Sequence, residues 1–570
     1  MTADGLYPAA MQFKAFALSV PDEVFGRIRP ALILVLAAVG FLLLITCANV
    51  MNLQLTRAEG RRREVAIRSA LGAGRLALAR SQLAESVLLA LLGGALGIVV
   101  ASFGAGLLAR FSAAGIPRLM ETRIDGSVLL FTLLVALTTA AIFGLAPLVH
   151  TGSGELGEVL KAGTRGAAGV VRKRLRNALV VGQMSMAMVL VIGAGLMLKS
   201  LWSLQRVDVG FNPSNVLTAQ VSLPETRYQS PESVVSFYER LLSNVRTLPG
   251  VEHAGFVRSL PLASPIGDWG LDIEGYVETP GREAKGDWQI ATSGYFEAMG
   301  ERIIRGRWFT DQDRTESPQV AVINDTMART YWPGDDPIGK RITMGSSNPN
   351  RPWVTVIGIV EDVKHNELTG IIKEKFYRPH SQFHLSTGNP IRGMTLVMRS
   401  AGDPTSLIAA IRRETAAVDP SVPVSNVRTM SEVLAAVTAG PRLTGWLMGI
   451  FAGLALTLAA IGLYGVLAYL VSRRTREVGI HMALGATVAQ VRTMIIGQGL
   501  RLAAAGIVIG TLVAVGVTRL MSSLLYSVTA TDPATFVAVP VVLAAVSVLA
   551  SYMPARRATK VNPMVALRDE

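Results

Sequence analysis

The sequence predicts an α-helical membrane protein that also carries one large α+β domain outside the membrane. Half of its 570 residues are hydrophobic, the mean hydropathy is +0.41, and only 17% of the residues are charged. The hydrophobic residues are gathered in long uncharged runs, which a mixed stretch at 200–441, rich in Pro and Gly, interrupts. This composition is too apolar for an ordinary soluble protein and is typical of membrane proteins.

Seven uncharged runs are long enough, or nearly so, to cross a bilayer as helices. They cover residues 31–53, 86–109, 127–149, 177–198, 443–472, 502–518 and 533–555. The sequence therefore predicts seven transmembrane helices in groups of three, one and three. The predicted division is a remnant extracytoplasmic segment at 1–29, a three-helix unit at 30–150, a cytoplasmic linker at 151–176, a single transmembrane helix at 177–199, the outer domain at 200–441, and a second three-helix unit with a cytoplasmic tail at 442–570.

The basic residues predict the orientation of the chain. Arginine and lysine crowd the segments 57–80, 161–176, 473–492 and 556–568, whereas 520–532 contains neither. Basic loops stay on the cytoplasmic side of a membrane. We therefore expect a multi-pass protein whose N-terminus and outer domain are extracytoplasmic and whose C-terminus is cytoplasmic. The same loops account for the net charge of +14, so the predicted partner is the lipid bilayer and not nucleic acid.

A short basic segment occurs twice, at 63–73 and at 476–486, each time between two apolar runs. Read as a helix, each copy has one apolar and one polar flank, and a glycine follows as a C-terminal cap. Such a helix is either a docking surface for a cytoplasmic partner or a helix lying on the lipid headgroups. The candidate docking residues are Arg63, Glu64, Ile67, Arg68, Leu71 and Gly72 in the first copy, and Arg476, Glu477, Ile480, Leu484 and Gly485 in the second.

The repeat continues into the next predicted span. The offset that relates Glu64 to Glu477 also relates Gly93 to Gly506 and Gly97 to Gly510. Gly-x-x-x-Gly lets helix backbones approach closely in lipid, so all four glycines are candidate helix-packing positions. Four spans separate the copies, so both run the same way through the membrane, unlike the inverted repeats of many secondary transporters. One departure is Arg501, which stands where the first copy has Leu88. It is expected either to extend towards the cytoplasmic side or to pair with another group.

The outer domain combines strand-like and helix-like patterns. Alternating residues at 216–223 precede a helical pattern at 234–248, and a similar order recurs at 394–398 and 407–418. Short apolar strands such as 320–323 lie between them. We expect a split subdomain of βαβ units around a mostly β insertion.

Catalytic, metal and cofactor sites are not predicted. Cys47 is the only cysteine, which excludes an intrachain disulfide and a thiol metal site. His380 and His384 form a close pair without acidic or cysteine neighbours. Residues 334–340 follow the first seven positions of a P-loop, but Arg341 replaces the Ser or Thr that would hold magnesium. The sequence therefore predicts a protein that is not an enzyme and has no cofactor.

The repeated segment, with its Arg-Glu-Val-x-Ile-x-x-Ala-Leu-Gly-Ala pattern, resembles the coupling segment of FtsX/MacB-type ABC transporter permeases. The motifs at 293–300, 332–340 and 356–363 resemble the periplasmic core domain of MacB-type proteins, and 554–568 resembles the C-terminal end of that family. The duplicated unit is similar to the duplicated orphan permeases of acidobacteria. Against that pattern we expect the chain to lack a first span and a first periplasmic domain, as a truncated start, a fragment or a shortened variant would.

The resemblance implies a function that the residue patterns do not show. It implies a bacterial inner-membrane permease with FtsX-like units and a MacB-like core domain, whose cytoplasmic segments contact a separate ABC ATPase. ATP-driven movement would then be transmitted to the outer domain for efflux or mechanotransmission, with a periplasmic or outer-membrane partner. The alternatives are a non-transporting scaffold or signalling permease that regulates an outer partner such as a cell-wall hydrolase, and a secondary transporter.

Overall fold

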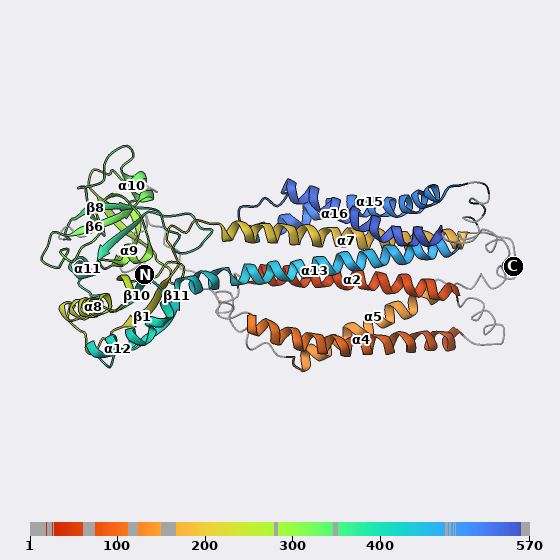
Figure 1. Cartoon of the computed structure of the whole chain (residues 1–570), viewed down its shortest axis with the longest axis horizontal. Coiled ribbons are helices and arrows are strands. Elements are labelled where there is room, and N and C mark those ends of the chain that lie inside the picture. Colours follow the sequence, from red (N-terminus) through yellow and green to blue (C-terminus); the bar gives the residue numbers. More distant parts are fainter. Residues whose placement is uncertain are drawn as a thin grey trace, which may run out of the picture. The chain divides into compact units, whose positions relative to one another are not determined.

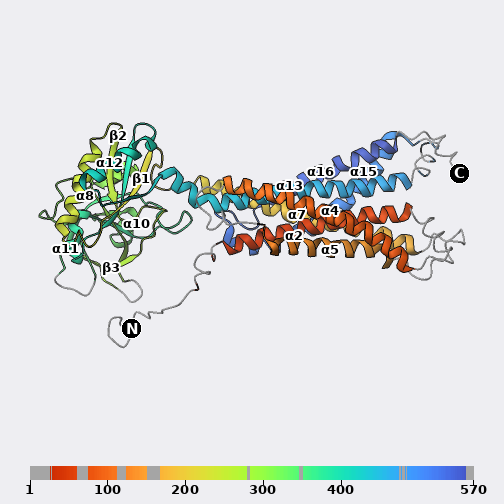
Figure 2. The ribbon, with the colours of Figure 1, turned by 90° about the horizontal axis from the view of Figure 1, so that it is seen from below.

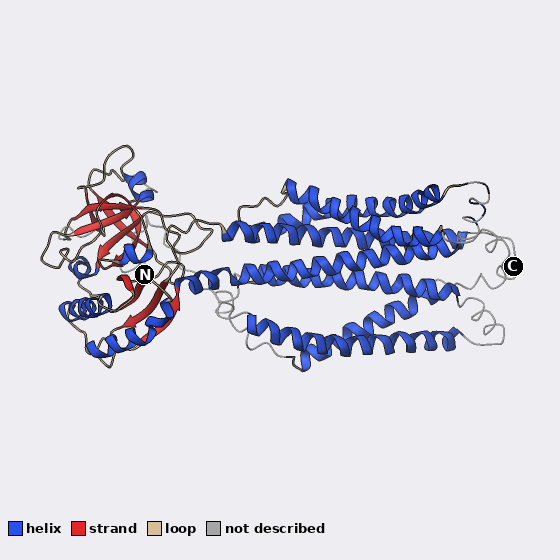
Figure 3. Ribbon diagram, in the orientation of Figure 1, coloured by secondary structure: helices blue, strands red, loops and turns tan. Residues whose placement is uncertain are grey.

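The chain folds into two compact units. The computed structural model describes residues 28–60, 75–111, 124–149, 167–278, 283–345, 351–473 and 486–559, together with residues 19, 26, 477, 480, 482 and 484. Unit 1 comprises Met1–Ser203 and Gly440–Glu570, and unit 2 comprises Leu204–Ala439. The chain passes from unit 1 to unit 2 near the end of one long helix and returns within another. In its described part, unit 1 consists of helices and loops, and the strands belong to unit 2 (Figure 3).

Unit 1 is a bundle of long apolar helices. They are α2 (Arg29–Gly60), α4 (Arg75–Phe111), α5 (Gly126–Val149), α7 (Ala167–Gln205), α13 (Met430–Arg473), α15 (Val488–Leu520) and α16 (Pro533–Ala558). Figures 1 and 2 both show them running alongside one another. Six are long and apolar enough to cross a membrane, whereas α5 counts only as a shorter apolar helix, over Gly126–Ala141. The chain is therefore a membrane protein, and the count of seven spans stays a prediction.

Several of the long helices, α13 and α15 among them, begin well before the apolar runs that the hydropathy pattern indicated. The expected runs began at 443 and 502, but α13 begins at Met430 and α15 at Val488. Each start is a capping box, in which a threonine and a side chain three residues later satisfy each other's backbone N–H groups. In α13 the pair is Thr429 and Glu432, and in α15 it is Thr487 and Gln490. Capping fixes a helix start independently of hydrophobicity, so an apolar run marks only the lipid-facing part of the helix.

Unit 2 is built on an 11-stranded sheet with the order β11-β1-β10-β2-β4-β3-β7-β8-β6-β9, and β5 pairs with β8. The strands are β1 (Val216–Ser222), β2 (Val251–Val257), β3 (Asp268–Ile273), β4 (Lys285–Ala291), β5 (Ile303–Gly306), β6 (Val320–Asn324), β7 (Arg341–Met344), β8 (Val354–Val360), β9 (Lys375–Pro379), β10 (Gly393–Ser400) and β11 (Val424–Thr429). The helices are α8 (Pro231–Arg246), α9 (Tyr295–Met299), α10 (Asp325–Tyr331), α11 (His380–Thr387), α12 (Ile408–Val418) and a short turn, η3 (Pro404–Leu407).

The first and last strands of unit 2 form one split subdomain. β10 lies between β1 and β2, and β1 lies between β10 and β11, with antiparallel pairing throughout. Each pair of consecutive strands is joined through a helix, α8 in one case and α12 in the other. This interleaving is the split βαβ arrangement, and strands β3–β9 form the insertion. It has the α+β character expected from the sequence.

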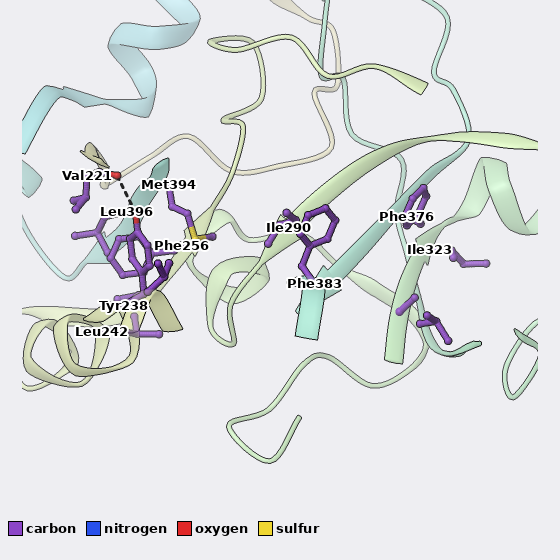
Figure 4. Packing of buried hydrophobic residues seen from close by; sticks show 14 of the residues in the cluster. Val221, Tyr238, Leu242, Phe256, Ile290, Ile323, Phe376, Phe383, Met394 and Leu396 are labelled. Carbon is purple, nitrogen blue, oxygen red and sulfur yellow. Dashed lines mark hydrogen bonds between the residues drawn. The ribbon is translucent and has the colours of Figure 1, made fainter. Parts of the chain in front are cut away.

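A large hydrophobic cluster packs α8 against the sheet of unit 2 and continues into the insertion. Tyr238 of α8 packs edge-on against Phe256 of β2, with ring centroids 5.0 Å apart, beside Leu396 of β10 (Figure 4). Its hydroxyl donates to the carbonyl oxygens of Val221 (3.0 Å) and Arg392 (2.6 Å). The buried ring thus stabilises the sheet–helix contact while its polar end remains hydrogen-bonded. The core extends through Phe383 to Phe376 in the insertion.

The P-loop-like stretch 334–340 is a turn between α10 and β7. Lys340, the residue that would contact phosphate, pairs instead with Asp335 at 3.2 Å. The backbone N–H groups of Gly339 and Lys340 donate to the carbonyls of Val356 and Pro337. These donors are engaged within the domain, so the loop does not present the cradle of N–H groups that a phosphate requires.

Candidate functional site

The candidate coupling segment of the second copy lies between α13 and α15. In its described residues, the N–H of Leu484 donates to the carbonyl of Ile480 at 2.9 Å, which is one turn of α-helix. Ile480 is 42% exposed and Leu484 is 81% exposed. Residues four apart lie on the same helix face. The turn therefore presents an apolar pair outwards, as a docking surface would.

The neighbouring helices hold this turn in place. Met482 packs against a small buried cluster made by Val491 and Ile495 of α15 with Ala555 and Ala558 of α16. The capping box at Thr487 then begins α15 directly after the turn. The buried cluster and the helix cap hold the turn at Met482 and Thr487, whereas the Leu484 side chain remains exposed.

The same end of unit 1 is rich in arginine, and we call it the basic end. Arg176 of α7 lies over the ring of Tyr469 of α13, 4.5 Å from its centroid. Arg557 of α16 donates to the hydroxyl of Tyr464 at 2.9 Å. These contacts join the ends of α7, α13 and α16 beside the turn. At the opposite end, Lys199 pairs with Asp532 at 2.6 Å.

Most of the predicted docking residues lie outside the described residues. This holds for the whole first copy and for Arg476 and Gly485, whereas Glu477, Ile480 and Leu484 are described and exposed. Their role in binding a partner stays a prediction. The first-copy residues that lie outside the described residues are Arg63, Glu64, Ile67, Arg68, Leu71 and Gly72.

The four candidate packing glycines have different surroundings. Gly506 and Gly510 of α15 lie against α7, where a Cβ at Gly510 would stand 2.6 Å from Met188 Cβ and one at Gly506 would overlap Met184. The hydroxyl of Ser185 donates to the Gly506 carbonyl at 3.1 Å. Around Gly93 and Gly97 of α4, no described atom lies within 4 Å of an added Cβ. The packing role of these four positions stays a prediction, and this geometry gives it a direct test.

A pair of amide side chains joins the two copies. Asn49 Nδ2 of α2 donates to the Leu458 carbonyl of α13 at 2.9 Å, and Gln183 Nε2 of α7 donates to Asn49 Oδ1 at 3.2 Å. The repeat offset carries Ile45 onto Leu458 and Asn49 onto Gly462. A Cβ at Gly462 would overlap the Asn49 and Gln183 amides. The copies therefore meet at equivalent positions, as in an isologous interface. Sequence reasoning missed this amide contact, although Asn49 and Gln183 are polar residues inside uncharged runs.

We expect Asn49→Leu to weaken the contact between the copies. An interhelical hydrogen bond within lipid contributes about 1 kcal/mol, so the variant should unfold about 1 kcal/mol more easily in a denaturation titration in detergent. Thr457→Leu is the control, because Thr457 bonds only within its own helix, to Gly453, on an exposed face. An equal loss in both variants would contradict the assigned role of Asn49.

Unit 2 contains a cleft beside α8. It has a volume of about 460 Å³ and is lined by Tyr238, Glu239 and Arg246 of α8 and by the loop around Asp311 and Arg314. Arg246 donates to the Ser293 carbonyl at 2.7 Å and pairs with Asp311 at 3.3 Å. Burial raises the pKa of Glu239 above its usual value. The cleft therefore combines charged side chains with a concave surface.

Three of the buried ionisable side chains of unit 2 interact electrostatically with one another. They are Asp287 of β4, Glu301 after α9, and Lys375 of β9. Burial raises the pKa of Glu301 to about 7 and lowers that of Lys375 to about 8. Burial, with a hydrogen bond shared with Asp268, raises the pKa of Asp287 to about 7. These three side chains lie inside the domain, so we expect them to affect its folding stability and not to contact a ligand.

Two family profiles match the chain. The FtsX-like permease C-terminal profile matches residues 36–155 and again 449–563, and the MacB-like periplasmic core domain profile matches residues 178–414. A helical membrane unit matched twice, joined to such an α+β domain, defines a permease with an extracytoplasmic domain. The chain belongs to the FtsX/MacB-type ABC transporter permeases, and it is a multi-pass inner-membrane protein.

Curated relatives agree with this family. The chain is similar to the "Macrolide export ATP-binding/permease protein MacB" of Marinobacter nauticus, at 24% identity over 47% of this chain and 41% of that protein. It is 28% identical to the MacB of an Azoarcus species over 47% of this chain and 40% of that protein. It is 26% identical to the "Uncharacterized ABC transporter permease YknZ" of Bacillus subtilis over 47% of this chain and 66% of that protein. The matches thus span less than half the length of the two MacB proteins.

Solved structures with similarity to the chain are extracytoplasmic domains. One is the extracellular domain of the transporter YknZ from Gram-positive bacteria, with a TM-score of 0.25, 16% identity, and coverage of 37% of this chain and 100% of that chain. Another is the periplasmic region of MacB from Actinobacillus actinomycetemcomitans, with a TM-score of 0.28 and 14% identity. That match covers 40% of this chain and 95% of the other.

Proposed function

We propose that the chain is the permease subunit of an ABC transporter, coupling a separate ATPase to the extracytoplasmic domain for efflux or mechanotransmission. It would cross the inner membrane seven times, with the basic end and the C-terminus in the cytoplasm. The exposed Ile480–Leu484 pair carries the proposal. Large apolar side chains so exposed at a membrane protein's basic end are typical of a protein-binding surface, and the sequence supplies the segment twice.

The ATPase-binding role is tested by charge substitution in both copies. We expect the affinity-purified chain from its native membranes to bring down an ABC ATPase, and the chain alone to hydrolyse no ATP. Leu71→Glu with Leu484→Glu should lower recovery of the ATPase at least about tenfold, because a buried apolar anchor contributes about 2 kcal/mol or more to an interface.

The control for that variant is Leu520→Glu. Leu520 is 84% exposed, closely matching Leu484, and it ends helix α15, which begins just after Leu484 and runs to the opposite end of the bundle. Its substitution should leave ATPase recovery unchanged. Full recovery of the ATPase by the Leu71 and Leu484 double variant would disprove the coupling assignment.

The charged cleft beside α8 supports a second candidate, a signalling permease that regulates an outer partner such as a cell-wall hydrolase. Arg246 and Asp311 give its rim both charges, which suits a polar partner. Crosslinking from Arg314, which also lines this cleft, in intact cells distinguishes the two candidates. A single hydrolase adduct, with export unchanged when the gene is deleted, would favour the signalling role.

A further inference from the structure

An apolar groove of about 390 Å³ lies between α2, α7 and α15 in the described part of unit 1. Its lining includes Phe41 of α2, Ala178, Gly182 and Val189 of α7, and Ile509 and Val513 of α15. Ser185 is the polar residue of the lining, and its hydroxyl donates to the carbonyls of Val181 and Gly506. Because that hydroxyl is engaged within the bundle, the groove offers a hydrocarbon surface to its occupant.

The length of the groove suits one acyl chain. Along α7 it runs from Ala178 to Val189, which is about 16 Å at 1.5 Å per residue. One leaflet contributes about 15 Å to the hydrocarbon thickness of a bilayer. The groove therefore extends through about one leaflet, starting from the basic end.

Arg174 stands at the mouth of the groove. It lies one helical turn before Ala178 on the same face of α7, and it is exposed. Among the described residues it has no hydrogen bond or ion pair, in contrast to Arg176, which lies over the Tyr469 ring. Side chains on a helix lean towards its N-terminus. The Arg174 guanidinium therefore extends past the groove towards the headgroups.

Arg501 adds a second charge within about one helical turn of Arg174 along the bundle. Gly506 packs against Val181 and Met184, so Arg501, five residues earlier on the parallel helix α15, lies level with residues 176–179. It is exposed and likewise has no partner among the described residues. An arginine on a lipid-facing helix surface is costly without a counter-ion. The first copy has Leu88 at the equivalent position, so this pair of charges occurs with α15 and not with α4.

We propose that this groove binds one anionic phospholipid, with an acyl chain along α7 and the phosphate between Arg174 and Arg501. The lipid comes from the leaflet at the basic end, which is the cytoplasmic leaflet in the proposed orientation. Its chain covers the outer edge of the α7–α15 contact beside Gly510, and its headgroup supplies the counter-ion for both guanidinium groups. The site is independent of ATPase binding.

The test is lipid binding by the delipidated full chain in neutral detergent, followed by native mass spectrometry. Phosphatidylglycerol and phosphatidylcholine with identical acyl chains are compared. We expect phosphatidylglycerol to bind at least about tenfold more tightly, since each arginine near an anionic headgroup contributes about a factor of five. Equal binding of the two lipids would overturn the proposal.

Two variants separate the charges from the groove. Arg174→Gln with Arg501→Gln should remove the preference for phosphatidylglycerol, whereas Arg556→Gln, at an exposed arginine of α16 at the same end, should leave it unchanged. Gly182→Leu should weaken binding of both lipids, because an added Cβ there meets no described atom within 4 Å and the side chain can occupy the groove. Gly453→Leu, at an equally open glycine of α13, is its control.

Each result of these variants decides the proposal. A charge preference that survives the loss of both arginines, or binding unaffected by Gly182→Leu, would place the lipid elsewhere. Competition by glycerol phosphate, which has no acyl chain, would show a phosphate site without the groove. Either finding overturns the proposed site, and the wild-type comparison stands even if a variant does not fold.

Discussion

Gly510→Leu is expected to cause a large loss of folded protein. A side chain at Gly510 would meet Met188 Cβ at 2.6 Å and the Ser185 carbonyl at 2.8 Å, so α15 and α7 must separate to admit it. Overpacking of this kind costs about 1–3 kcal/mol, and backbone atoms cannot yield as a flexible side chain does. We expect a strongly reduced yield of monodisperse protein and a lower midpoint of thermal unfolding in detergent.

The chain offers two matched controls for this prediction. Gly516→Leu places the same side chain on the same helix, where no described atom lies within 4 Å of the Cβ. Gly97→Leu changes the position in the first copy that is equivalent to Gly510. An added Cβ at Gly97, as at Gly516, has no described atom within 4 Å. Both variants should behave like the wild type. A loss at Gly516 equal to that at Gly510 would mean that any leucine there disturbs α15, and that the contact with α7 is not the cause.

The glycine motif illustrates what the sequence can predict of this membrane unit. A Gly-x-x-x-Gly spacing shows where a helix surface is thin enough for another backbone to approach. It does not say which helix approaches, because that depends on the arrangement of spans far apart in the chain. The contact of α15 with α7 joins residues more than 300 positions apart, as the Ser185–Gly506 hydrogen bond records.

Hydropathy predicted the apolar helices of unit 1 well and their ends poorly. The runs at 177–198 and 533–555 fall within α7 and α16. The true starts of α13 and α15 depend on Thr429 and Thr487, whose caps are visible as Thr-x-x-Glu and Thr-x-x-Gln once they are sought. In the outer domain the alternation at 216–223 predicted β1, but the place of β10 between β1 and β2 follows from long-range pairing.

The buried charges of unit 2 were beyond sequence reasoning. Lys375, Glu301 and Asp287 occur among ordinary surface-type residues, and charged side chains are rarely buried. Asp287 and Lys375 become neighbours because β4 and β9 pair in parallel within the insertion, where the two residues are register partners. Once buried, they constrain each other, because each charge needs an opposite charge in a medium that solvates it weakly.

Lys375→Met is expected to destabilise the outer domain strongly. It removes the buried cation whose charge favours the ionised forms of Glu301 and Asp287. Removing one partner from a buried group of charges costs about 3–5 kcal/mol. Hydrogen exchange of the β9 strand in the full chain should report this loss. Lys373→Met is the control, because Lys373 is half exposed and pairs with Asp268 at 2.9 Å on the surface, where an ion pair contributes about 0–1 kcal/mol.

The same group predicts how stability depends on pH. The pKa of Glu301 is about 7 in the folded protein and 4.5 for an ordinary glutamate. Between these values the folded state keeps a proton that the unfolded state has lost, so the free energy of unfolding falls as pH rises through the window. Glu301→Gln removes this titration and should flatten the decline in β9 protection between about pH 4.5 and 7. Asp287 titrates in the same range and leaves a residual slope. An unchanged slope in Glu301→Gln would show that the side chain is solvated in the folded protein, which its burial opposes.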